Sequence, residues 1–160
     1  MTLETRNSII TVVLGIIIIG LGWYLYHSIV GPYQVVEKQK RYTREVRQNM
    51  ENLRVALIHY NQEKKHFPPT KGGLDSLVHF IRTDSTMKAK RDSLFKSDIS
   101  DGYKWKIDSL AYSPRPPHNK FKYTLNDSIN PPLYLLKDPD SNDKIGSLNK
   151  PTLLNAPNWK

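Results

Sequence analysis

The sequence contains no cysteine, and charged residues are missing from one long stretch near its start. Without a thiol, the chain has no disulfide, no thiolate nucleophile and no cysteine-ligated zinc or iron–sulfur centre. Arg6 is followed by no Asp, Glu, Lys or Arg until Glu37. Within this interval residues 9–26 are nearly all apolar, and about 20 such residues at about 1.5 Å rise span the apolar core of a bilayer. The sequence therefore predicts a transmembrane helix over residues 8–30, after an N-terminal tail of residues 1–7.

Aromatic residues at the end of the apolar run distinguish a retained anchor from a cleaved signal peptide. A signal peptide has a shorter apolar core and small residues before its cleavage site. This run ends instead in Trp23, Tyr24 and Tyr26, and such amphipathic rings concentrate at the membrane–water boundary. We therefore expect a single-pass anchor in the lipid bilayer that carries one solvent-exposed domain.

A second, amphipathic helix is predicted over residues 31–65. Gly31-Pro32 can break or kink a helix, which separates this segment from the anchor. Apolar side chains then recur at steps of three or four, as on one face of an α-helix: Tyr42, Val46, Met50, Leu53, Leu57 and Tyr60. The opposite face carries charged side chains: Lys40, Arg44, Arg47, Glu51 and Arg54. We expect the apolar face to pack in a core or against a partner, and the helix to end at residues 66–69, where proline supplies no amide hydrogen.

Residues 66–160 are predicted to form a loop-rich domain of helices and strands. Apolar spacing predicts one short helix over residues 74–81, and the polar stretch 87–95, which contains Met87, Leu94 and Phe95, is a candidate for a second. Alternation of apolar and polar residues predicts strands at 103–108 and 121–126, and residues 133–136 are a third candidate. The predicted fold class is therefore α+β, with an N-terminal transmembrane helix, a long amphipathic helix and a small antiparallel β-sheet.

The residue patterns of enzymes and cofactor sites are missing from the sequence. Ser85 and Lys88 have the serine–lysine spacing of some acyl-transfer enzymes, as do Ser93 and Lys96, but neither pair has a companion motif. None of the five histidines belongs to an H-E-x-x-H pattern, and Gly72-Gly73 lacks the spacing of a phosphate-binding loop. We therefore predict no enzymatic activity, no cofactor and no small-molecule substrate. Nucleic-acid binding is not expected either, because no zinc-finger or helix-turn-helix pattern occurs.

An acidic stretch near the end of the chain raises the question of calcium. Asp138, Asp140 and Asn142 offer hard oxygen ligands at alternate positions, as calcium requires. The EF-hand pattern then fails, because Asp143 stands in place of the turn glycine and Asn149 in place of the bidentate glutamate. We therefore predict a solvated turn and no metal site, and leave calcium binding as a question for experiment.

Small residues follow one face of the predicted transmembrane helix. Ser8, Gly15 and Gly22 recur at intervals of seven, and Thr11 lies between them. Small side chains allow a neighbouring helix to approach closely in a membrane. These four residues are therefore the candidate partner-binding site, and other membrane-protein subunits are the expected partners, through this helix and the long amphipathic helix.

The predicted order of elements resembles that of type IV pilins and of the pseudopilins of type II secretion systems. The closest local match is residues 53–77, in which a helix ends in Phe67-Pro68 and a Gly73-Leu74-x-x-Leu77 turn follows. The stretch 138–148 is similar to the late loop of that family. The resemblance implies a pilin-like fold, a structural role in secretion and a periplasmic domain on an inner-membrane anchor.

The start of the sequence departs from that family, and the distribution of charge opposes the periplasmic orientation that the family implies. A precursor of this class carries a basic leader that ends in Gly, followed by Phe and by Glu five residues into the mature chain, whereas this sequence begins Met1-Thr2-Leu3-Glu4. We therefore expect an accessory subunit that stays in the membrane. The rule that positive residues near a span stay inside favours a cytoplasmic domain, because the first basic residues after the apolar run outnumber Arg6 before it: Lys38, Lys40, Arg41 and Arg44. We give the resemblance more weight and expect a periplasmic one.

Three functions are compatible with these patterns. The first is a non-enzymatic, membrane-anchored structural subunit of a bacterial envelope complex for secretion. The second is an accessory subunit of an inner-membrane energy-transducing or gliding motor, docked through the small-residue face. The third is a basic tethered module that binds anionic lipid or nucleic acid on the cytoplasmic side.

Overall fold

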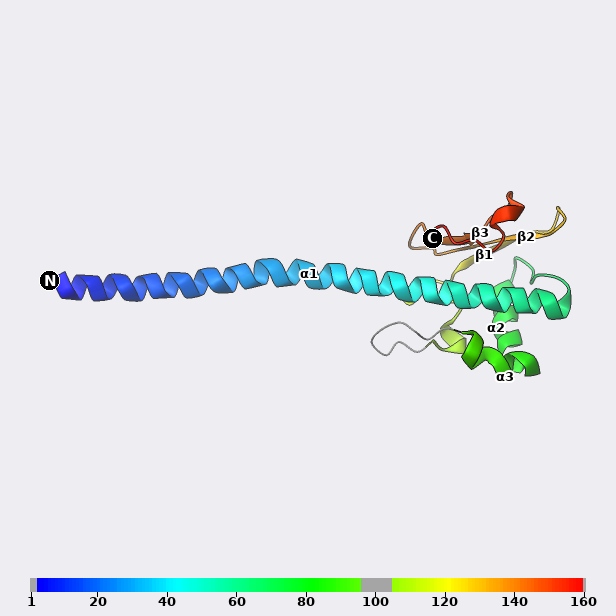
Figure 1. Ribbon diagram of the computed structural model, residues 1–160, viewed down its shortest axis with the longest axis horizontal. Helices are drawn as coiled ribbons and strands as arrows, with labels where there is room; N and C mark the ends of the chain where they lie inside the picture. The colour runs from blue at the N-terminus through cyan, green and yellow to red at the C-terminus, as the bar shows by residue number, and fades with distance from the viewer. Residues whose placement is uncertain (1–2, 96–104, 160) are drawn as a thin grey trace. The chain divides into compact units, whose positions relative to one another are not determined.

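The computed structural model describes residues 3–95 and 105–159 of an α+β chain (Figure 1). Its long N-terminal helix is followed by two short helices and a small antiparallel sheet. The elements in order are α1 (Leu3–Lys64), α2 (Gly73–Thr83), α3 (Ser85–Leu94), η1 (Ile107–Ser109), β1 (Lys122–Asn126), β2 (Leu133–Lys137), β3 (Lys144–Gly146) and η2 (Pro151–Leu153). The chain divides into two compact units, Met1–Arg41 and Tyr42–Lys160.

Helix α1 is continuous through Gly31-Pro32, where the sequence allowed a break or a kink. Its 62 residues include Pro32, and it begins at Leu3, so residues 3–7 are helical as well. Proline removes one amide donor from a helix. A break creates a new C-terminus and a new N-terminus, which leave about four carbonyls and about four amides without partners. Continuing through Pro32 therefore costs fewer hydrogen bonds than stopping, and of the break or kink that the sequence allowed at Gly31-Pro32, the break does not occur.

The two short helices after α1 confirm the helix predicted from apolar spacing and the candidate helix that follows it. α1 ends at Lys64, just before the predicted proline stop, and Lys65 takes a positive φ of 64°. α2 buries one side of its surface in the domain core. α3 begins where the Asp84 carboxylate accepts a hydrogen bond of 2.9 Å from the Met87 amide, which satisfies one of the unpaired amides of a helix start.

The sheet has the order β1-β2-β3, and both of its pairs are antiparallel. β1 and β2 confirm two of the predicted strands, and β3 was not predicted. The strand expected at 103–108 is wrong over its described part, because Ile107–Ser109 forms a 3-10 turn; residues 103 and 104 lie outside the described residues. The amides of Ser109 and Leu110 bond back to the carbonyls of Lys106 and Ile107 at 3.2 Å, so local turns replace strand pairing.

One hydrophobic core joins the helices to the sheet within residues 42–160. Figure 1 shows the sheet on one side of the later part of α1 and α2 with α3 on the other. The predicted apolar face of α1 supplies fully buried side chains, namely Val46, Met50, Leu53 and Leu57. Tyr134 of β2 lies in the same core, where burial raises the pKa of its hydroxyl above the usual range. That hydroxyl therefore stays protonated and donates to Asn155 Oδ1 at 2.7 Å.

The charged face of the amphipathic helix is not a simple solvated surface. Arg54 forms an ion pair of 2.6 Å with Glu51 and donates to the carbonyl of Asn155. Arg47 reaches Asp143, and its guanidinium lies 5.2 Å from the ring centre of Trp159. The C-terminal segment therefore packs on the charged side of this helix.

Candidate functional site

The N-terminal part of α1 exposes a long apolar surface. α1 is long and apolar enough to cross a membrane, and none of its most apolar window is buried within the chain. Between Ile9 and Val36 the large apolar side chains are 47% to 74% exposed, except Val30, which is partly exposed. Residues 9–36 rise about 42 Å at about 1.5 Å per residue, which exceeds the roughly 30 Å apolar core of a bilayer. The exposed surface therefore extends past residue 30, where the predicted span ends.

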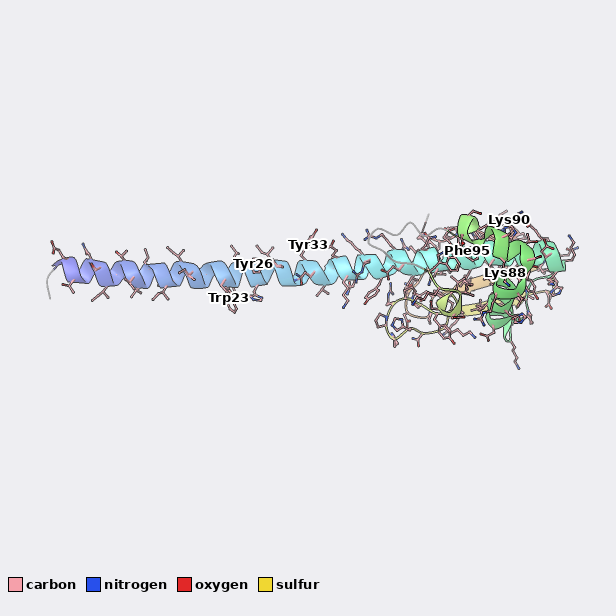
Figure 2. The ribbon with its side chains drawn as sticks, turned by 90° about the horizontal axis from the view of Figure 1, so that it is seen from below. Trp23, Tyr26, Tyr33, Lys88, Lys90 and Phe95 are labelled. Carbon is pink, nitrogen blue, oxygen red and sulfur yellow. The ribbon has the colours of Figure 1, made fainter. Side chains whose placement is uncertain are left out.

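Aromatic side chains gather near the end of that surface. Trp23, Tyr26 and Tyr33 point outward from α1 (Figure 2) and are 63% to 68% exposed. The ring of His27 lies edge-on to Trp23 at 4.7 Å between centres. Aromatic rings with one polar group suit the membrane–water boundary, so this cluster marks where a spanning helix would leave the apolar core.

The small residues predicted as a partner-binding site do share one face of α1. At about 100° per residue, Ser8, Thr11, Gly15 and Gly22 fall within a sector of about 60°. A Cβ atom added at Gly15 or Gly22 would meet nothing within 4 Å. The Thr11 hydroxyl donates to the Asn7 carbonyl at 3.0 Å, so it is satisfied within the helix. This face is open to another helix, and its role as an interface stays a prediction.

The acidic stretch forms a compact turn between β2 and β3. Asp138 is fully buried, and its Oδ2 accepts a hydrogen bond of 2.6 Å from Ser141. Asp140 turns to a different partner, because its Oδ1 accepts from Asn119 at 2.8 Å. The Asn142 carbonyl accepts from Asn158 at 2.9 Å. The solvated turn that the sequence predicted is therefore partly buried, because the core and the C-terminal segment cover it.

Two arginines from distant parts of the chain supply positive charge to this turn. Arg47 of α1 donates to both oxygens of the Asp143 carboxylate, at 2.8 and 3.1 Å. Arg115 lies 3.8 Å from Asp138 Oδ2 and donates to the Asp140 carbonyl at 3.1 Å. Sequence reasoning missed both arginines. Arg47 is separated from Asp143 by 96 positions, and no local spacing signals such a pair.

A metal ion finds little support at this turn. Within residues 3–95 and 105–159, no three or more His, Asp or Glu side chains come together as a metal-binding group. Among the described residues, one buried carboxylate oxygen, Asp138 Oδ1, has no hydrogen-bond partner. One such oxygen falls short of the 6–8 ligands that calcium takes. Arg47 and Arg115 already supply positive charge to the carboxylates of this turn. Calcium should therefore stabilise the folded domain only weakly.

Ser93 and His118 make contacts with backbone carbonyls in the described part of the chain. The Ser93 hydroxyl donates to the Lys90 carbonyl at 2.8 Å, and Lys96 lies outside the described residues. A hollow of about 550 Å³ is lined in part by Glu45, Ser113 and His118. There the His118 ring nitrogen contacts the Ser113 carbonyl at 3.0 Å, not its hydroxyl. That geometry lacks the contact between nucleophile and base that acyl transfer requires.

Comparisons with protein-family models, with curated proteins and with solved structures give no match for this chain.

Proposed function

We propose that this chain is a non-enzymatic, single-pass subunit of a bacterial envelope complex, with a pilin-like domain and a role in secretion. The observation that carries the proposal is the exposed apolar surface of α1 from Ile9 to Val36. An apolar surface of that size is not stable in water. A bilayer covers about 20 residues of a helix, and the remainder favours helix tilt or contact with neighbouring subunits.

The pilin-like assignment is supported by how residues 53–77 pack. Tyr123 of β1 donates its hydroxyl to the Pro68 carbonyl at 3.0 Å. A Cβ added at Gly73 would lie 3.1 Å from the Tyr123 ring, so the glycine permits this close approach. Phe67 packs against Tyr134 at 5.2 Å between ring centres, and Leu77 is fully buried. The residues that carry the family resemblance thus join the helix to the sheet, as a fold-determining motif should.

The proposed orientation places the domain in the periplasm, on an inner-membrane anchor. Because the sequence has no cysteine, a single introduced thiol reports its own location. Ser128→Cys lies in the exposed loop between β1 and β2, and a membrane-impermeant maleimide should label it in intact spheroplasts. Ile17→Cys, within the span, is the control and should resist labelling before and after lysis. Labelling of Ser128→Cys only after lysis would contradict this orientation and favour the cytoplasmic basic module.

The proposed assembly is tested by purification of the full chain in mild detergent from its native membrane. We expect defined partner subunits to co-purify in constant proportion to the chain. Both a secretion complex and a motor complex would use the same face of α1. The identity of the co-purified subunits therefore distinguishes the two. Recovery of the chain alone, as a monomer, would contradict the assembly.

A further inference from the structure

Three lysines form a straight row across the sheet. Lys122 of β1 lies directly opposite Lys137 of β2, and Lys137 lies directly opposite Lys144 of β3. All three side chains are exposed. The neighbouring register of Tyr123, Leu136 and Ile145 is buried in the core. Because successive side chains of a strand point to opposite faces, Lys122, Lys137 and Lys144 share the outer face, and we name them the lysine row.

The nearest carboxylates in the sequence do not neutralise the lysine row. Asp138 follows Lys137 and Asp143 precedes Lys144, but both carboxylates are buried. They interact with Arg115 and Arg47 respectively. In the part of the chain that the structure describes, ion pairs occupy Lys120 and several arginines but none of the lysine row.

Such an arrangement is unfavourable in the isolated domain. Cβ atoms of directly opposite residues lie about 4.5–5.5 Å apart, and like charges at that spacing destabilise a sheet. Lys137, in the middle, experiences this repulsion from both sides. A negatively charged partner would reduce the repulsion between the lysines. This reduction would add to the favourable free energy of binding.

We propose that the lysine row is the docking surface for a carboxylate-rich segment of a partner protein. The row extends over two strand spacings, about 10 Å, which matches a few side chains of an extended segment. Beside it on the same face lie Thr124 and Leu135, both partly exposed, which offer a hydroxyl and an apolar contact. None of these residues belongs to the apolar part of α1, and the proposal does not depend on the secretion role.

The other end of the outer face limits the size of this surface. Asn126 donates from its amide to the Leu148 carbonyl at 2.9 Å, and Leu133, opposite Asn126, is fully buried. The chain after β3 therefore covers that end. Single-stranded nucleic acid would need aromatic rings for base stacking, and none lies on this face in the described strands. Lipid-binding clusters commonly hold four to eight cations, more than the row provides. A protein segment fits best.

The test measures binding of a fluorescein-labelled, ten-residue glutamate–serine peptide to the full chain in nonionic micelles by fluorescence anisotropy. The row variant combines Lys122→Gln, Lys137→Gln and Lys144→Gln. We expect its Kd to rise about tenfold or more, because three cation–carboxylate contacts are lost. The matched control removes the same total charge from exposed lysines outside the sheet, through Lys71→Gln, Lys88→Gln and Lys90→Gln, two of which lie on α3 (Figure 2). Its Kd should change less than threefold.

Several outcomes would overturn the proposal. Equal weakening in the row variant and the control would mean that net charge alone attracts the peptide. Unchanged binding by the row variant would show that the lysine row is not the docking surface. The same titration with a 20-nucleotide single strand, and with nanodiscs containing phosphatidylglycerol, tests the other polyanions. A tenfold loss for either of these without a loss for the peptide would reassign the surface. Unchanged near-ultraviolet circular dichroism in both variants verifies that each is folded.

Discussion

Replacing Leu57 by alanine should destabilise the domain strongly, because its side chain is fully buried in the core formed by α1 and the sheet. The change removes three carbons, worth about 2.4 kcal/mol at about 0.8 kcal/mol each. The cavity left behind raises the typical cost to about 2–5 kcal/mol. At roughly 4 °C per kcal/mol for a domain of this size, the melting temperature should fall by about 8 to 20 °C.

The assay follows near-ultraviolet circular dichroism of the full chain in mild detergent during heating. This signal reports tertiary packing around Trp105 and Trp159, both within residues 42–160. The matched control is Leu21→Ala, the same chemical change at a side chain that is 61% exposed in the apolar part of α1. It should leave the transition unchanged. A Leu57→Ala melt that coincides with the unaltered chain would refute the reasoning, because this face of α1 would then not be the core.

Three further predictions follow from particular residues. Gly15→Ile with Gly22→Ile should reduce co-purification of partner subunits without preventing membrane insertion, because both side chains remain apolar but block close helix approach; unchanged co-purification would exclude the face as an interface. Gly146→Ala should lower the melting temperature by more than 5 °C, because φ is 88° and the new Cβ would lie 2.3 Å from the Tyr134 carbonyl oxygen, whereas Gly15→Ala should not lower it. Calcium should raise the melting temperature no more than magnesium does, and Asp140→Ala should change that response little; a calcium-specific rise abolished by Asp140→Ala would reveal a metal site.

Local patterns in the sequence predicted several elements correctly because their causes are local. The apolar period of three to four residues identified α2 and the buried face of α1, alternation identified β1, and a short apolar run identified β2. The same alternation failed at 103–108, where Trp105 and Ile107 pack against the core from an irregular segment. Alternation of apolar and polar residues indicates only which side chains are buried. A turn can bury alternate residues as a strand does, so the pattern does not distinguish the two. β3 has three residues, too few for a period to be recognised.

The sequence alone determined the uncharged apolar run, the aromatic residues at its end and the apolar face of the following helix, because composition and spacing along one chain decide these features. Only the tertiary structure brought Arg47 to Asp143 and aligned Lys122, Lys137 and Lys144 across the sheet. Both depend on strand register and on segments that meet from distant positions. Register is set by which side chains fill the shared core, and that choice is made by packing among all the elements together.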